Sequence, residues 1–169
     1  MPAKNAITKS STDFLNVMRL VDSRASRLRI MHKPKSQENL EEVYEFLSND
    51  DNVIHLSHIM YPAIAYKELK RVMGVSIKEY ERIFAHTWRG IAQKQDNDNV
   101  DRSYSERLLS ILRIYAQGIA VFGDPDKLNT WLSSYSPTLA TDPRQLLDTI
   151  LGCGKVADEL GRIEHGILA

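Results

Sequence analysis

Apolar residues recur every three or four positions along most of the chain, which is the period of an α-helix with one buried face. Segments with this pattern follow Thr12, Ser36, Pro62, Ser76, Ser103 and Thr149. Residues 53–60 are ambiguous, because they fit either a short strand or an extended approach to the next helix. The pattern therefore predicts an all-α fold built as a helical bundle.

Polar residues mark where these helices begin. The sequences Ser76–Glu79 and Ser103–Glu106 predict capping boxes, in which each side chain accepts the backbone N–H of the other residue. Asp-Pro pairs at 124–125 and 142–143 predict two further helix starts, and glycines at 74, 123 and 166 predict helix ends. The helix over 103–122 is apolar over too wide a surface for one stripe, so we expect it to be central.

Residues 53–100 predict a helix-turn-helix unit, with a recognition helix from Trp88 to about Gln95. The candidates for DNA contact are Thr87, Arg89, Gln93 and Lys94. Two features oppose this interpretation. Gly90 inside the recognition helix costs about 1 kcal/mol relative to Ala, and the loop Asp96–Asn99 is acidic. A plain pair of packed helices therefore stays open as the alternative.

Charge is unevenly distributed, although the chain has 22 basic and 22 acidic residues. Residues 1–35 hold eight Lys or Arg and two Asp. Because the whole chain has no net charge, residues 36–169 have an equal excess of acidic residues. The basic segment, with Arg24, Arg27 and Arg29, fits contact with phosphates or an acidic partner, or a solvated helix face. The single cysteine and the lack of a long apolar segment lead us to expect a cytoplasmic protein.

Sequence motifs of catalytic or metal-binding chemistry are missing. The chain has no glycine-rich phosphate loop, nucleophile elbow or zinc signature. His55 and His58 have a spacing used by metal ligands, but no further pair supports them, and Cys153 fits a small buried apolar residue. We expect no enzyme activity, no cofactor and no metal.

Three separated blocks resemble the C-terminal domain of Xre/MbcA/ParS-type antitoxins. They are RLLSILRIYAQGIAVFGDPDKLNTWL, PRQLLDT and the terminal LGRIEHGILA. The resemblance covers roughly residues 60–169. It implies an antitoxin of a type II toxin–antitoxin system, paired with a RES-domain toxin that degrades NAD or transfers ADP-ribose from it. The expected domains are an N-terminal helical extension (1–52), an Xre-like helix-turn-helix domain (53–100) and a C-terminal toxin-binding domain (101–169).

The terminal helix and tail are the expected toxin-blocking element. The candidate residues are Arg162, Glu164, His165, Gly166, Ile167, Leu168 and Ala169. Arg162 and Glu164 would supply charged contacts and His165 a polar one, while Ile167, Leu168 and the terminal carboxylate would enter the toxin's NAD cleft. The alternatives are a packed helix with a frayed end, and a DNA-binding transcriptional regulator without a toxin. We also expect a homodimer that represses its own promoter.

Overall fold

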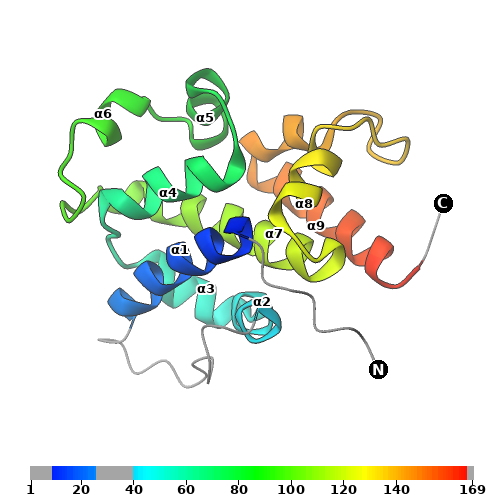
Figure 1. Cartoon of the computed structure of the whole chain (residues 1–169), viewed down its shortest axis with the longest axis horizontal. Coiled ribbons are helices and arrows are strands. Elements are labelled where there is room, and N and C mark those ends of the chain that lie inside the picture. Colours follow the sequence, from blue (N-terminus) through cyan, green and yellow to red (C-terminus); the bar gives the residue numbers. More distant parts are fainter. Residues whose placement is uncertain (1–8, 26–39, 167–169) are drawn as a thin grey trace.

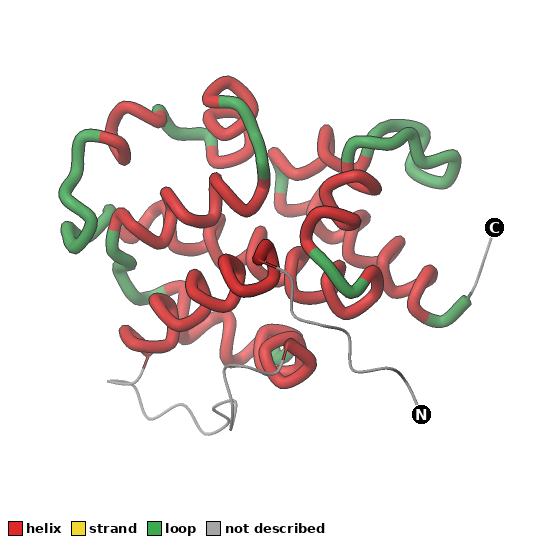
Figure 2. The backbone as a smooth tube through the Cα atoms, viewed as in Figure 1, coloured by secondary structure: helices red, strands yellow, loops and turns green. Residues whose placement is uncertain are grey.

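The structure is a computed structural model that describes residues 9–25 and 40–166. Over these ranges it consists of helices joined by loops, without a strand (Figure 2). In chain order the elements are α1 (Lys9–Ala25), α2 (Leu40–Ser48), α3 (Asp50–Ser57), α4 (Ala63–Met73), α5 (Ile77–Phe84), α6 (Trp88–Ala92), η1 (Arg102–Tyr104), α7 (Ser105–Phe122), α8 (Pro125–Leu132), η2 (Pro143–Asp148) and α9 (Ile150–Glu164). The all-α prediction is confirmed. The ambiguous residues 53–60 belong to α3 and the turn after it.

Helix α7 is the centre of the bundle, as the width of its apolar surface predicted. It contacts α2 and α3 as well as α8 and α9 (Figure 1). Its buried hydrophobic residues are Leu108, Leu109, Ile111, Leu112, Ile114, Tyr115, Ala116 and Ile119. Burying each large apolar side chain contributes about 1.5–3 kcal/mol, so α7 fixes the positions of the helices around it.

The N-terminal helices share this hydrophobic core. Helix α1 packs on α4 and α8, and its Phe14 ring stacks on Tyr115 of α7 with 6.4 Å between ring centroids. Helix α2 packs on α7 through Val43 and Leu47. Helix α1 begins at Lys9, so Thr12 lies inside the helix and does not cap it. Ser36, after which a helical segment was expected, lies outside the described residues.

Helix starts follow the predicted caps in part. The Ser76–Glu79 capping box is present, with Ser76 Oγ accepting the Glu79 N–H at 3.2 Å and Glu79 Oε2 accepting the Ser76 N–H at 3.1 Å. The prediction of a capping box at Ser103–Glu106 was wrong. The Asp101 carboxylate accepts the Ser103 N–H at 2.9 Å and starts the 3₁₀ turn η1, so α7 begins only at Ser105.

The start of α9 depends on a close approach of two backbone segments. A Cβ atom at Gly152 would lie 2.0 Å from the carbonyl oxygen of Leu146 in η2. A Cβ atom at Gly154, by contrast, would meet no described atom within 4 Å. One glycine is therefore required by packing and the other is not. No helix in the described part of the chain has the length and apolar character to cross a membrane.

We predict opposite effects on stability for alanine at these two positions. Gly152→Ala forces η2 away from α9 and should lower the free energy of unfolding by about 1–3 kcal/mol. Gly154→Ala should raise it by about 0.5–1 kcal/mol, because alanine has less conformational freedom to lose in a helix. Urea unfolding of both variants beside the wild type measures this difference. Equal effects of the two substitutions would contradict the close approach at Gly152.

Candidate functional site

Helix α9 is held at its start and along one face, and its last turn is exposed. The Thr149 hydroxyl accepts the Gly152 N–H at 2.9 Å, which confirms the predicted cap. Val156 and Leu160 are fully buried. Cys153 is buried, as expected, and burial raises the pKa of its thiol. The helix is therefore anchored by its first three turns.

The end of α9 lies near Gly166, as predicted. Gly166 adopts a left-handed conformation with φ +67°, and its N–H donates to the Ile163 carbonyl at 3.1 Å. Glu164, His165 and Gly166 are exposed. Arg162 forms an ion pair within its own helix, with the largely buried Glu159. The candidates Ile167, Leu168 and Ala169 lie outside the described residues.

A groove of about 390 Å³ runs beside this helix end, and we call it the α2–α9 groove. Its lining residues are Tyr44 and Ser48 of α2, Arg113 and Gln117 of α7, and Ala157, Asp158, Gly161, Arg162 and His165 of α9 and its C-terminus. Two of the predicted tail residues therefore share a surface with α2. Sequence reasoning missed this groove, because helical periodicity does not say which distant helices become neighbours.

The predicted recognition helix is shorter than expected. Helix α6 spans Trp88–Ala92, and Gln93 is already its C-cap. Thr87 occupies the N-cap position, but its side chain forms no capping hydrogen bond. The Glu81 carboxylate of α5 accepts the Trp88 N–H instead, at 2.8 Å. Together with the Trp88 ring, which packs edge-on against Tyr80 at 4.9 Å, this contact joins α5 and α6 into one unit.

The residues proposed to contact DNA are brought together on and just after α6. Thr87, Arg89 and Gln93 are exposed, while Lys94 is half-buried. The Lys94 carbonyl accepts a hydrogen bond from the Lys67 ammonium group at 2.9 Å. The four residues thus lie on one short segment, and three of them are open to a ligand.

The acidic loop Asp96–Asn99 lies at the N-terminus of α4. Backbone carbonyls of Asp98 and Asp96 accept the N–H groups of Ala63 and Ile64 at 2.9 and 3.0 Å. Negative charge near a helix N-terminus stabilises the helix by about 0.3–1 kcal/mol. Asp96 also pairs with Lys67 at 2.9 Å. The Asp98 carboxylate accepts the Gln95 N–H at 2.8 Å, so both acidic side chains have partners within the chain.

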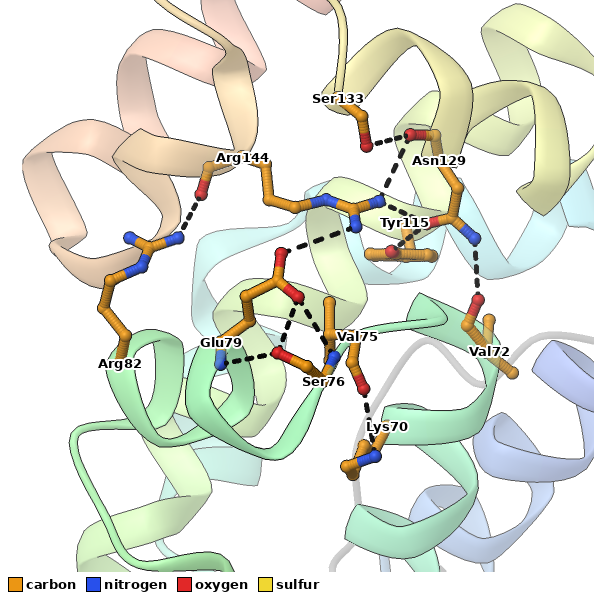
Figure 3. Close-up of polar contacts among 10 residues, drawn as sticks. All are labelled: Lys70, Val72, Val75, Ser76, Glu79, Arg82, Tyr115, Asn129, Ser133 and Arg144. Atoms are coloured by element: carbon orange, nitrogen blue, oxygen red, sulfur yellow. Dashed lines mark hydrogen bonds and ion pairs between the residues drawn. The ribbon is translucent and has the colours of Figure 1, made fainter.

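Polar contacts link α5 to the C-terminal helices (Figure 3). The Arg82 guanidinium donates to the backbone carbonyls of Gln145 at 2.9 Å and Arg144 at 3.0 Å. The Arg144 guanidinium donates to the Asn129 carbonyl at 3.2 Å and lies 4.0 Å from the Glu79 carboxylate. Hydrogen bonds from Ser76, and then the neighbouring arginines, lower the pKa of Glu79. These contacts hold α5 against η2 and α8.

The candidate metal pair does not assemble into a site. His58 contacts the guanidinium of Arg102. Within the described ranges, no three His, Cys, Asp or Glu side chains gather as metal ligands.

His86 lies in the connection between α5 and α6, stacked on Tyr104 with ring centroids 3.5 Å apart. Burial, followed by the nearby Arg107 charge, lowers the pKa of its imidazole, and Asp101 opposes this in part. A lowered folded-state pKa means that the unfolded chain binds the proton more readily. The stabilisation due to neutral His86 is therefore present above the unfolded pKa, about 6.5, and is lost as the pH falls through the folded pKa.

We predict that His86→Phe reduces the loss of stability between pH 7 and pH 5. Phenylalanine keeps an aromatic ring on Tyr104 but cannot be protonated. The measurement is the free energy of urea unfolding at both pH values for wild type and variant. Carboxylate titration contributes to the pH dependence of unfolding in both proteins, so the difference between their pH dependences reports on His86. The same pH dependence in both would show that His86 does not carry the effect.

The sequence was compared with known protein families and with individual proteins. Residues 117–166 match the model of the antitoxin Xre/MbcA/ParS C-terminal toxin-binding domain. Antitoxin Xre of Yersinia enterocolitica is 28% identical over 120 residues, which are 70% of this chain and 74% of that protein. Antitoxin Xre of Photorhabdus laumondii is 28% identical over 104 residues, which are 60% of this chain and 64% of that protein, just under two thirds. These matches confirm the expected resemblance and support an antitoxin of a toxin–antitoxin system.

Proposed function

We propose, from the toxin-binding family of residues 117–166, that the protein neutralises a RES-type, NAD-consuming toxin in the cytoplasm by blocking its active site. The blocking element is the end of α9 with the tail after it. The observation that carries the proposal is the contrast along α9, where Val156 and Leu160 are buried but Glu164, His165 and Gly166 are exposed. A helix anchored at its start and open at its end can present that end to a partner.

The physical chemistry of the helix end suits an NAD cleft. The last carbonyl groups of a helix have no partners within it and form the negative end of its dipole. Together with Glu164, those of the last carbonyl groups that do not accept the N–H groups of His165 and Gly166 can pair with basic side chains that otherwise hold a pyrophosphate. Because α9 is already ordered, little conformational entropy is lost when it docks. His165 supplies a polar contact, while Ile167 and Leu168 enter the cleft.

The position of Arg162 suggests a different role from that of Glu164. Its guanidinium pairs with Glu159, which is only 9% exposed. Pulling it away would leave a largely buried carboxylate without its cation, which is costly. Arg162 therefore contacts the toxin from its paired position, whereas Glu164 is free to turn toward the partner.

We predict that truncation after Ile163 abolishes inhibition of the toxin and leaves the fold intact. This truncation keeps the Arg162–Glu159 pair and the buried Val156 and Leu160. NAD consumption by the purified toxin, with full-length or truncated protein added, measures inhibition, and thermal unfolding controls for the fold. Equal inhibition by both forms would show that another surface holds the toxin. The same result is expected if the protein is a DNA-binding regulator without a toxin, because such a regulator does not need residues 164–169.

A second part of the proposal concerns DNA. We propose that residues 53–100 form an Xre-like helix-turn-helix domain and that the protein, as a homodimer, represses its own promoter. In this division residues 1–52 are an N-terminal extension and residues 101–169 the toxin-binding domain. Support comes from the exposure of Thr87, Arg89 and Gln93 on one segment. Two copies are required for a palindromic site.

We predict that Arg89→Ala weakens promoter binding by about 1–3 kcal/mol if Arg89 contacts a base edge. Each phosphate contact in the complex should add about 0.9 to the slope of log affinity against log salt. Gel retardation with promoter and unrelated DNA, at several salt concentrations, measures both quantities. Lys127→Ala, which removes an exposed charge from α8, is the control and should have no effect. If the wild type binds both DNAs equally, α5 and α6 are only a packed pair of helices.

A further inference from the structure

We infer that the α2–α9 groove is a second part of the toxin-binding surface, and that it receives an acidic side chain from the toxin. The inference rests on the proposed function, because it requires the toxin to dock at the end of α9. It assigns a role to α2, which lies outside the segment that matches the toxin-binding family.

The groove is continuous with the proposed blocking element. Arg162 and His165 belong to the predicted tail site and also line the groove. Helix α2 forms the opposite wall with Tyr44 and Ser48, because both α2 and α9 pack on α7. A toxin that encloses the end of α9 therefore also meets α2.

The charges in the groove favour a carboxylate as its occupant. Arg113 and Arg162 line it, and Asp158 is the one carboxylate among the lining residues that the structure describes. Arg162 is held by Glu159, so Arg113 is the cation that can take a new partner. The Arg113 guanidinium lies 2.7 Å from Asp50, whose side chain is 76% exposed. Such a solvated ion pair contributes little to stability, so Arg113 can exchange Asp50 for an acidic group of a partner. A guanidinium binds a carboxylate through two parallel hydrogen bonds, which gives the contact direction as well as affinity.

The shape of the groove also suits an inserted side chain. Gly161 leaves the α9 wall open, since a Cβ atom there would lie 3.7 Å from Gln117 Nε2, an ordinary contact distance. The Gln117 amide is held in place by donating to the Ala157 carbonyl at 3.1 Å. The floor of the groove is therefore ordered before a partner arrives, and binding loses little side-chain entropy.

Charge reversal at Arg113 tests this inference. Arg113→Glu should raise the Kd for the purified RES-domain toxin about tenfold or more, and Arg113→Lys should have a smaller effect because lysine lacks the planar fork. Lys78→Glu makes a similar charge reversal at an exposed position of α5, outside the groove, and should leave toxin binding unchanged. Circular dichroism checks the fold of each variant. Wild-type affinity of Arg113→Glu would overturn the inference.

Photo-crosslinking identifies the occupant directly. A Tyr44→benzoylphenylalanine variant, irradiated in complex with the toxin, should crosslink to the toxin. A crosslink to a second antitoxin chain would mean that the groove is a dimer interface. A crosslink within the chain to residues 167–169 would mean that the tail occupies it. Either of these results without a toxin adduct, or no adduct at all, would overturn the inference.

Failure of this inference and failure of the proposed function give different results. If truncation after Ile163 abolishes inhibition but Arg113→Glu binds the toxin normally, the assignment of the blocking element is supported and that of the groove is wrong. If truncation leaves inhibition intact but Arg113→Glu weakens binding, the toxin is held at the groove and the blocking element is wrong. If neither change affects the toxin, both assignments are wrong.

Discussion

The apolar surface of α7 extends around most of the helix, and its burial requires partners on more than one side. Helices α2 and α3 supply one part of that cover, and α8 and α9 another. The α2–α9 groove exists because two helices from distant parts of the chain use neighbouring faces of the same central helix.

Local sequence predicted the elements well, where a single residue or a short motif decides the conformation. Gly74, Gly123 and Gly166 all have positive φ at helix ends, as expected from their lack of a side chain. Prediction failed where two local signals compete. Asp101 starts a turn ahead of the Ser103–Glu106 motif, so α7 begins only at Ser105.

The candidate sites could be predicted only in part. Glu164 and His165, which are adjacent in sequence, were predicted as tail residues, and the structure places both in the exposed end of α9. The contribution of Tyr44 and Arg113 to the α2–α9 groove was not predicted, because it depends on which helix faces pack together. The acidic loop Asp96–Asn99 shows a related limit. Its charge argued against DNA, but the carboxylates of Asp96 and Asp98 have partners within the chain, the Lys67 ammonium group and the Gln95 N–H.

Arg82 contacts η2 mainly through the main chain of η2, and through one side chain, the Asp148 carboxylate, at 3.5 Å. Both hydrogen bonds that it donates to η2 end on backbone carbonyls, those of Arg144 and Gln145, and every amino acid carries a carbonyl. The exposed side chain of Gln145 is therefore free to change in related proteins while the junction between α5 and η2 is kept. This separation leaves the surface around the base of α9 open to substitution without altering how its helices are assembled.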